Sequence, residues 1–379
     1  MKTNLKKLLY SGVTLMSLGV LAACSTASSS TTTSSSVTTS QSATGSSNST
    51  ASNSSSSSID WSALPTTEVT LSNDGLKITE GGTYILTGST TAGVTVETDA
   101  NVRIVLAGAD ISSSDNAAIN VIKADNVELE IKDGTSNTVK DTSNHSDTNI
   151  EGAIHVEADL TITGNGNLTV EGNFQDGIVS TDDLVINASS IKVTAVDDGI
   201  RGKDSLTING GTIDVTAGGD GIKSTNDTDT TKGYTTITGG DITVKAGDDG
   251  IKAETALTID GGTITVPESL EALEGTNITI NGGTLDVYGS DDAINAASTT
   301  STDIFIKVTG GDLKVAVGSG DTDAFDANGD IYISGGTIDV TAPTSAFDFD
   351  GTAELTGGTV RVNGEQISQI VATGPGARW

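Results

Sequence analysis

The chain has 379 residues, of which 50 are acidic and 19 are basic, so its formal net charge at pH 7 is −31. Nucleic acid and anionic membrane surfaces offer no positive charge to meet this surface, so the charge argues against both as direct partners. A single cysteine excludes a disulfide framework and a cysteine-based zinc site. Aromatic residues make up only 3% of the chain and glycine numbers 46, which favours an all-β protein whose core consists of small β-branched residues.

The N-terminal segment, residues 1–23, has the composition of an export signal. Three lysines stand within residues 2–7, and the apolar stretch after them is shorter than the roughly 20 residues of a membrane-spanning helix. It ends in the sequence LAAC at residues 21–24, which resembles a bacterial lipobox. Residues 1–23 are therefore predicted to be a lipoprotein signal peptide, and Cys24 is predicted to be the lipidated residue. The lipid on Cys24 would anchor the chain in the cell membrane on its extracellular face. The alternative is an ordinary secretory signal with an incidental cysteine.

A tract of low complexity follows Cys24. Ser and Thr dominate the stretch from 25 to 58, and no residue in it is charged. Such a segment has almost nothing to bury and cannot offset the entropy cost of ordering itself, so residues 24–58 are predicted to be a disordered tether. A flexible coil of this length would span about 30 Å. Residues 59–379 are predicted to form the folded domain, which carries every acidic residue.

The domain sequence repeats itself, and the repeat predicts the fold. The clearest unit is SLTINGGTIDVTAGGDGIK at residues 205–223, and related units begin at residues 256, 277, 303 and 330. The second glycine of the Gly-Gly pair recurs along the chain, at Gly211, Gly240, Gly262, Gly283, Gly311, Gly336 and Gly358. A base period of about 22 residues with loop-like excesses indicates a solenoid with insertions on particular turns.

The pattern inside each unit indicates strands. In the unit at residues 205–223, apolar and polar residues alternate on both sides of the Gly-Gly pair, which predicts two strands joined at a corner. Gly211 would supply the positive φ that a sharp corner requires. The expected fold is an all-β, right-handed parallel β-helix of about 22 residues per coil, with coils stacked about 4.8 Å apart. A leucine-rich repeat and a β-sandwich fit the repeated turn sequence less well.

Alignment of the units brings acidic residues into register. The alignment uses the apolar residue after the last corner of each coil, at Ile178, Ile200, Ile222, Ile251, Leu273, Ile294 and Phe325. Two positions earlier stand the residues that we call the acidic column: Asp176, Asp198, Asp220, Asp249, Glu271, Asp292 and Asp323. One position further back, three coils carry a further acid, the outer acids Asp197, Asp248 and Asp291. Stacked coils would place these residues along one edge.

Two interpretations of the acidic column remain open. Asp-Gly is a favourable turn sequence in which the carboxylate accepts nearby backbone N–H groups. Like charges about 4.8 Å apart, however, repel by roughly 1 kcal/mol in water and roughly 3.5 kcal/mol at an effective dielectric constant of 20. Ca²⁺, which takes six to eight oxygen ligands, would compensate this repulsion. The expected calcium ligands are Asp197, Asp198, Asp220, Asp248, Asp249, Glu271, Asp291 and Asp292.

Three cations follow the aligned apolar residues in successive coils. Arg201, Lys223 and Lys252 either pair with the acids beside them or bind the carboxylates of an acidic sugar chain next to bound Ca²⁺. The two histidines show neither metal-ligand spacing nor a catalytic context. His145 lies in a polar insertion at residues 132–149 and is expected to be a solvated loop residue, whereas His155 follows Ile154 on a predicted strand.

At this point the sequence resembles a known family. The Gly-Gly-Thr-Ile coils, the edges DDGIR at 197–201 and DDGIK at 248–252, and the lipobox with its Ser/Thr tether are similar to bacterial carbohydrate-binding β-helix lipoproteins. The resemblance covers about residues 60–379. It implies a pectate-lyase-like fold, calcium, and binding of acidic plant-wall polysaccharide such as polygalacturonate, or of cellulose. It also implies a calcium role for Asp197, Asp198, Asp220, Asp248, Asp249, Asp291 and Asp292. The column ends where Ser345 replaces an acid.

The leading hypothesis is a monomeric, surface-tethered protein that binds acidic polysaccharide with Ca²⁺ as its cofactor. The first alternative is a polysaccharide lyase acting by calcium-assisted β-elimination. Arg201 is the one candidate base beside the column, although arginine ionises far above the working pH that suits a general base. The second alternative is a passive adhesin or stalk that Ca²⁺ stiffens.

Overall fold

The computed structural model describes residues 59–320 and 322–373. The predicted signal peptide (1–23), Cys24 and the predicted tether (24–58) lie outside the described residues. Within them the chain forms 32 β-strands and one short 3-10 helix, η1 (Trp61–Ala63), so the prediction of an all-β protein is confirmed. In this part of the chain, no helix has the length and apolar composition needed to span a bilayer.

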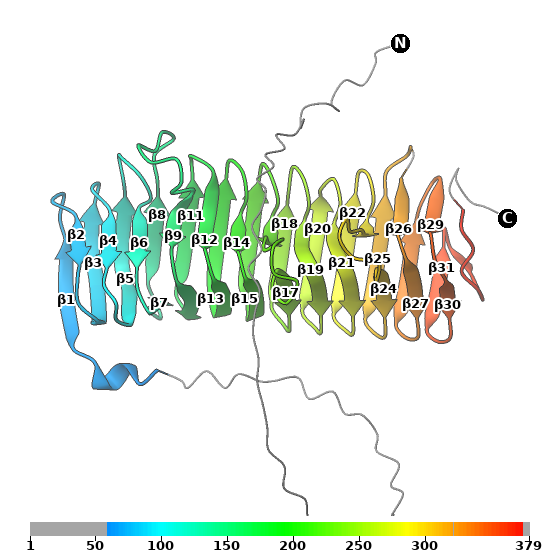
Figure 1. The fold of residues 1–379 in the computed structure, drawn as a ribbon, viewed down its shortest axis with the longest axis horizontal. Coiled ribbons are helices and arrows are strands. Elements are labelled where there is room, and N and C mark those ends of the chain that lie inside the picture. Colours follow the sequence, from blue (N-terminus) through cyan, green and yellow to red (C-terminus); the bar gives the residue numbers. More distant parts are fainter. Residues whose placement is uncertain (1–58, 321, 374–379) are drawn as a thin grey trace, which may run out of the picture. The chain divides into compact units, whose positions relative to one another are not determined.

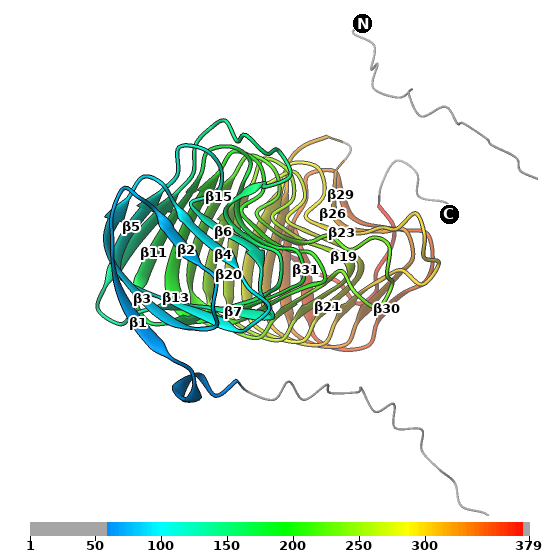
Figure 2. The ribbon, with the colours of Figure 1, turned by 60° about the vertical axis from the view of Figure 1, so that its left-hand side comes forward.

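The strands form three ladders of parallel pairs, and the chain passes through the three ladders in turn, once per coil (Figures 1 and 2). Each strand inside the stack pairs with the equivalent strands of the preceding and the following coil. Leu206, for example, pairs with Leu184 on one side and with Thr235 on the other. Because side chains alternate along a strand, this register aligns the inward-facing residues of successive coils.

The first ladder contains β1 (Thr66–Leu71), β3 (Gly82–Thr90), β5 (Val102–Ser112), β7 (Asn126–Ile131), β10 (Asp159–Gly164), β13 (Asp183–Ala195), β15 (Ser205–Ala217), β17 (Tyr234–Ile237), β19 (Ile251–Ile259), β21 (Leu273–Ile280), β24 (Phe305–Val308), β27 (Asp330–Ile333) and β30 (Ala353–Leu355). The second contains the later parts of β3, β5, β13 and β15 with β8 (Ser136–Lys140), β11 (Asn167–Gly172), β18 (Asp241–Lys245), β20 (Thr263–Glu268), β22 (Thr284–Gly289), β25 (Asp312–Val317), β28 (Thr337–Thr341) and β31 (Thr359–Val362).

The third ladder contains β2 (Leu76–Ile78), β4 (Val94–Glu97), β6 (Ile119–Lys123), β9 (Gly152–Val156), β12 (Asp176–Ser180), β14 (Ile200–Gly202), β16 (Ile222–Ser224), the early parts of β19 and β21, β23 (Ile294–Ala296), β26 (Asp323–Ala327) and β29 (Ser345–Phe349). A last strand, β32 (Glu365–Gln366), pairs antiparallel with β31. This hairpin is the one antiparallel strand pair among the described strands, and it covers part of the final open edge.

The core lies between the three ladders and is built from columns of identical or similar side chains. Ile200 pairs with Ile178 and Ile222, and all three are fully buried. Near the C-terminal end the same column ends in Phe325 and Phe347, whose rings stack with centroids 5.2 Å apart. The corners also follow the prediction, because the second glycine of each aligned Gly-Gly pair has a positive φ, from 80° at Gly358 to 112° at Gly240.

The prediction for His145 is wrong. The imidazole is buried rather than solvated, and it stacks on the ring of Phe174 with a centroid distance of 4.3 Å. Its Nε2 lies 2.9 Å from Oδ2 of the buried Asp141, and its Nδ1 faces the carbonyl oxygen of Ile150. The polar insertion therefore has a small core of its own. Sequence pattern could not indicate the stacking, because Phe174 belongs to the next coil, although Asp141 lies only four residues before His145.

Candidate functional site

The acidic column lies at the corner between the second and third ladders. The aligned apolar residues pair in the expected register through the third ladder, for example Ile222 with Ile251 and Ile251 with Leu273. The predicted alignment of the coils is therefore confirmed. Asp176, Asp198, Asp220 and Asp249 are all at most 5% exposed. The outer acids Asp197, Asp248 and Asp291 are exposed to solvent instead.

Backbone N–H groups satisfy one oxygen of several column residues. Oδ1 of Asp176 accepts the N–H of Asp198 at 3.1 Å, and Oδ1 of Asp198 accepts that of Asp220 at 3.0 Å. Oδ1 of Asp220 then accepts the N–H of Asp249, also at 3.0 Å. Each aspartate therefore binds the backbone of the next coil, as expected from the turn chemistry of Asp-Gly. Further along the chain, Oδ1 of Asp292 accepts the N–H of Asp323 at 2.7 Å.

The three cations satisfy the second oxygens in the N-terminal half of the column. A guanidinium nitrogen of Arg201 lies 2.9 Å from Oδ2 of Asp176 and also pairs with Glu151. Lys223 bridges two coils, with Nζ 2.5 Å from Oδ2 of Asp198 and 2.9 Å from Oδ2 of Asp220. These pairings match the interpretation in which the cations neutralise neighbouring acids.

Lys252 is the last of the three cations along the column. Its Nζ lies 2.7 Å from Oδ2 of Asp249 and also pairs with Glu274 in the next coil. Burial opposes the charged form of Lys252, but hydrogen bonds to Asp249 and Glu274 outweigh it and raise the pKa of the ammonium group. Two carboxylates thus compete for one cation. Burial and the proximity of Glu274 raise the pKa of Asp249, so Asp249 holds a proton more readily than an ordinary carboxyl group.

The environment of Arg201 does not suit a general base. Its side chain is 20% exposed and is held by two carboxylates. Burial opposes the guanidinium charge, yet Asp176 and Glu151 outweigh it and raise the pKa of Arg201. A base needs a pKa near the working pH, which is a shift in the opposite direction. Lys223, with a side chain 18% exposed, is similarly committed to its two aspartates.

The C-terminal half of the column carries most of the uncompensated negative charge. No lysine or arginine of the described chain forms an ion pair with Glu271 or Asp292. Burial raises the pKa of Glu271 to about 7, with repulsion from Asp249 and Asp292 adding to the shift and the hydrogen bond from Asn295 opposing it. Burial also raises the pKa of Asp292 to about 6, with Asp291 adding to the shift.

Asp326 extends this negative region by one further position. It lies in the third ladder, where it pairs in register with Asn295 and Asp348. Burial raises its pKa to about 7, and Asp292 contributes repulsion and a hydrogen bond between the two carboxyl groups. Two carboxyl groups hydrogen-bonded to each other share a proton or require a cation.

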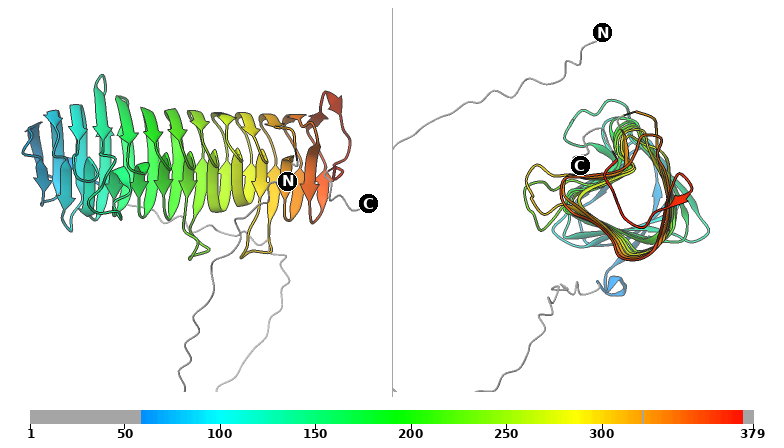
Figure 3. Two further views of the ribbon diagram at one scale, coloured as in Figure 1. Left: turned by 90° about the horizontal axis from the view of Figure 1, so that it is seen from above. Right: turned by 90° about the vertical axis from the view of Figure 1, so that its right-hand side faces the viewer.

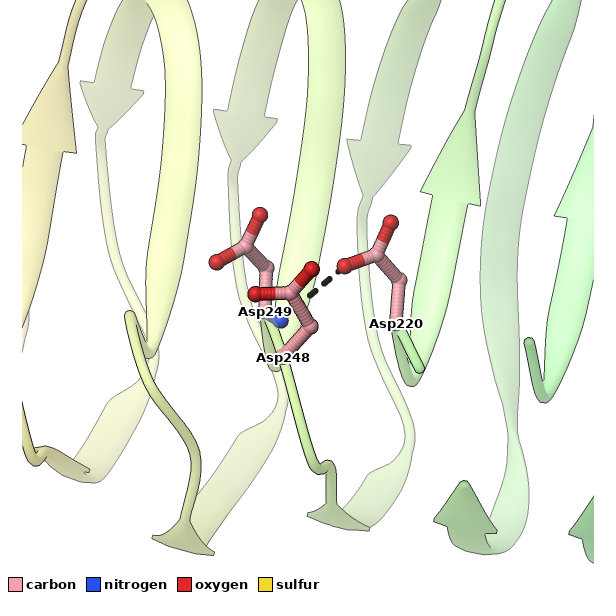
Figure 4. A group of neighbouring side chains, drawn as sticks. All are labelled: Asp220, Asp248 and Asp249. Atoms are coloured by element: carbon pink, nitrogen blue, oxygen red, sulfur yellow. Dashed lines mark hydrogen bonds between the residues drawn. The ribbon is translucent and has the colours of Figure 1, made fainter. Parts of the chain in front are cut away.

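Two groups of acids bring their oxygen atoms within 4.8 Å of one another. The first is Asp220, Asp248 and Asp249, drawn in Figure 4, and the second is Asp249, Glu271 and Glu274. In Figure 4 the three carboxylates of the first group lie side by side, with the exposed Asp248 between the two column residues. Two oxygens on opposite sides of one Ca²⁺ ion would be up to about 5 Å apart, so each group is compact enough to share an ion.

The predicted ligands are therefore brought together only in part. Asp220, Asp248, Asp249 and Glu271 belong to the two compact groups. Asp197, Asp198, Asp291 and Asp292 lie along the same edge but in no such group among the described residues. Their calcium role stays a prediction. Glu274 was not predicted as a ligand, although its place beside the aligned residue Leu273 was visible in the sequence.

The donor chemistry of both groups fits Ca²⁺. All of the side-chain ligands are carboxylate oxygens, the type preferred by hard cations, and none is a sulfur or imidazole donor. The fit is best around Asp248, because this carboxylate is exposed and retains unshared oxygens. Asp220 and Asp249 would also have to divide their oxygens between a metal ion and the ammonium groups of Lys223 and Lys252.

Comparison with known proteins agrees with the fold and indicates a class of ligand. A carbohydrate-binding domain-containing protein of Acetivibrio thermocellus is 33% identical over 135 residues, which are 34% of this chain and 47% of that protein. The chain thus spans about half the length of this relative. The solved structure of a polysaccharide lyase-like protein from C. thermocellum, a gadolinium derivative, is 32% identical with a TM-score of 0.52. The match covers 58% of this chain and 95% of that one. Residues 72–324 match the family described as carbohydrate-binding domain-containing protein, so the chain belongs to that family.

Proposed function

We propose that the chain binds acidic polysaccharide, with Ca²⁺ held by the acidic column and its outer acids. Membership of a family described as carbohydrate-binding supports a polysaccharide as the ligand. We propose the acidic class of the polymer from the charge of this edge. A polyanion would be repelled by the metal-free column, whereas bound divalent ions would neutralise the carboxylates and leave coordination positions for the carboxylates of the polymer.

One observation carries this proposal, the group formed by Asp220, Asp248 and Asp249. It combines two buried carboxylates, which would fix an ion, with an exposed one at the surface that a polymer can reach.

Retention of the chain on immobilised polygalacturonate tests the proposal. We expect retention in Ca²⁺, release by a chelator, and a loss of at least about tenfold in affinity for Asp248→Asn/Asp249→Asn, because the compact group then loses two charged ligands. The matched control is Asp214→Asn/Asp241→Asn, which removes the same charge from exposed strand positions of neighbouring coils. Retention that survives both the chelator and the double variant would refute the proposal.

Two further measurements on the same samples, thermal melting and ultraviolet absorbance, separate the alternatives. A stalk that Ca²⁺ only stiffens would lose thermal stability in the chelator and bind no glycan. A lyase would release unsaturated products that absorb in the ultraviolet. Arg201 forms ion pairs with Asp176 and Glu151, which keep its side chain protonated. A protonated arginine can orient a substrate but cannot act as a base, so we favour binding over catalysis.

We further propose that the domain is a right-handed parallel β-helix and that the chain acts as a lipid-anchored monomer. The parallel pairing of each strand with the preceding and following coils supports the β-helix. The LAAC sequence ending at Cys24 supports the anchor. An anchored chain would present the acidic edge to polysaccharide outside the cell. Labelling with a radioactive fatty acid that is lost in Cys24→Ser would test the anchor.

A further inference from the structure

Two insertions at one corner of the stack border a cleft that is separate from the acidic column. Residues 225–233 join β16 to β17, and residues 297–304 join β23 to β24. In the two coils between them, β19 and β21 run through this corner without a loop. The two insertions project from the same side of the stack, visible in the left view of Figure 3 as a green and a yellow-orange loop. They form the walls of a cavity of about 440 Å³.

An exposed aromatic ring lies in this cleft. Tyr234, the first residue of β17, lines it and is 38% exposed. In a chain with only five tyrosines, five phenylalanines and two tryptophans, exposed rings are scarce. An aromatic face packs well against the C–H groups on one face of a sugar ring, while the phenol hydroxyl remains available to water or to sugar hydroxyls. The floor beside Tyr234 is formed by the small residues Thr255 and Ala256, which leave room for a ligand.

The polar groups of the cleft suit hydroxyls rather than carboxylates. Asp227 and Glu254 are its two charged residues, and both are exposed acids. No lysine or arginine is among the described residues that line it. Carboxylates accept hydrogen bonds from sugar hydroxyls and repel the carboxylates of a uronate. The hydroxyl and amide groups of Thr231, Asn277 and Ser301 add neutral donors and acceptors.

The walls of the cleft are held in place by internal hydrogen bonds. The buried Asn226 accepts the N–H groups of Thr228 and Asp229 with Oδ1 and donates from Nδ2 to Asp204. On the opposite wall, Oγ of Ser298 accepts the N–H of Ser301 at 3.1 Å. Thr255 donates its hydroxyl to the carbonyl oxygen of Lys232 at 2.7 Å, which ties the floor to the first wall. Ordered walls lower the entropy cost of binding a ligand.

We propose that this cleft binds a short stretch of a neutral polysaccharide, with one sugar ring stacked on Tyr234, and that it does so without metal. A second cavity of about 330 Å³ shares Glu254 and Thr276 with the cleft and continues towards Lys252 and Glu274. A chain longer than the cleft therefore has a path along the surface. The cleft itself is independent of the calcium proposal, because neither the acidic column nor the two compact groups of acids contribute a residue to its lining, whereas the second cavity reaches Glu274 of one of these groups.

The test measures binding of neutral hexasaccharides of glucose, xylose and mannose to the full chain by calorimetry in 1 mM EDTA, with hexagalacturonate as the acidic probe. We expect at least one neutral hexasaccharide to bind, Tyr234→Ala to weaken this binding about tenfold or more, and Tyr234→Phe to preserve it. Thr300→Trp should also weaken binding by filling the cleft. Tyr288→Ala removes a similarly exposed tyrosine from β22, outside the cleft, and should change nothing.

Each result decides the proposal. Absence of neutral-sugar binding at millimolar concentration, or binding that needs Ca²⁺, overturns it, as does binding that neither Tyr234→Ala nor Thr300→Trp weakens. Unchanged melting temperatures of the variants exclude loss of the fold as the cause of weaker binding. The calcium proposal is tested on the same samples by hexagalacturonate with added Ca²⁺, and it can fail while the cleft binds neutral sugar, or succeed while the cleft does not.

Discussion

At the scale of single residues, three aspartates of the acidic column, Asp176, Asp198 and Asp220, each have two structural partners. One carboxylate oxygen accepts a backbone N–H of the next coil, as Asp176 does from Asp198, and the other pairs with a cation, as Asp176 does with Arg201. This arrangement explains how successive acids stack without metal in the N-terminal half of the column. It also means that each cation there is needed, because a buried carboxylate without its partner bears the full cost of desolvation.

Arg201→Met should therefore destabilise the protein. The substitution keeps an apolar side chain but removes the charge that faces Asp176, whose side chain is only 4% exposed. We expect the free energy of unfolding at pH 8 to fall by about 3 kcal/mol. Asp176 has a pKa of about 7, raised mainly by burial and lowered by Arg201, so at pH 5.5 it is mostly protonated and the loss should be smaller. Urea denaturation at the two pH values measures both losses.

Lys314→Met is the matched control for this prediction. Lys314 lies 3.6 Å from Asp286, and both side chains are more than 60% exposed. Exposed pairs contribute little, so its loss should change the free energy of unfolding by about 0.5 kcal/mol or less at either pH. Equal losses for Arg201→Met and Lys314→Met would contradict the role given to the buried pair.

At the scale of elements, the corner that carries the acidic column depends on close backbone stacking. The residue after each acid is glycine in four successive coils, at Gly177, Gly199, Gly221 and Gly250. Its N–H donates to the carbonyl oxygen of the acid in the next coil, at 2.8 Å from Gly221 to Asp249. A Cβ at Gly221 would lie 2.6 Å from the carbonyl oxygen of Gly250 and in conflict with Cγ1 of Val244.

Gly221→Ala should consequently lower stability by about 1–3 kcal/mol, the usual cost of overpacking a well-packed site. Because the substitution pushes two coils apart, it should also weaken the grouping of Asp220 with Asp248 and Asp249 and reduce Ca²⁺ uptake. Gly210→Ala is the control, since a Cβ at Gly210 meets no atom within 4 Å and its φ is not positive. Thermal melting and calcium calorimetry of the two variants check the prediction, and equal behaviour of both would contradict it.

The repeat made the ladders and their register predictable. Alternating apolar residues and recurring Gly-Gly corners specify which residues face inward, and one aligned column such as Ile200, Ile222 and Ile251 then fixes the register of every coil. Side-chain direction was not predictable in the same way. Whether Lys252 points to Glu274 or towards solvent depends on the relative positions of two coils and on burial, which are tertiary properties.

The start of the stack and the cleft were also beyond prediction from the sequence. Residues 66–97 already form coils that pair in parallel, although their one Gly-Gly pair, Gly81-Gly82, stands at the start of β3 and not at a corner aligned with the repeat. The cleft depends on two insertions from different coils that the stacking brings to the same corner. The lengths of the two insertions were visible in the sequence as excesses over the base period. Whether the insertions face each other across a cleft, however, depends on the number of coils between them.

At the scale of the whole molecule, charge is distributed unevenly along the acidic edge. Cations balance the column up to Lys252, whereas Glu271, Asp292 and Asp326 have raised pKa values of about 7, 6 and 7, caused first by burial and then by neighbouring acids. A protein with a net charge of −31 cannot relieve this repulsion by long-range attraction to the rest of its surface. Protons or divalent ions are the available means of compensation.

The metal-free protein should therefore become less stable as the pH rises from 6.5 to 8. The folded-state pKa values of Glu271 and Asp326 lie above those of unfolded carboxyls, so the folded state binds more protons in this range and the free energy of unfolding falls as they dissociate. His155 works in the opposite direction, because burial lowers its pKa from the ordinary value of 6.5 to about 4, but its remaining gain in stability above pH 6.5 is only about 0.4 kcal/mol. Calorimetry in EDTA should find a fall in Tm of about 5 °C. Asp326→Asn should reduce that fall, and a Tm that rises over the same range would show that these carboxyls are not protonated in the fold.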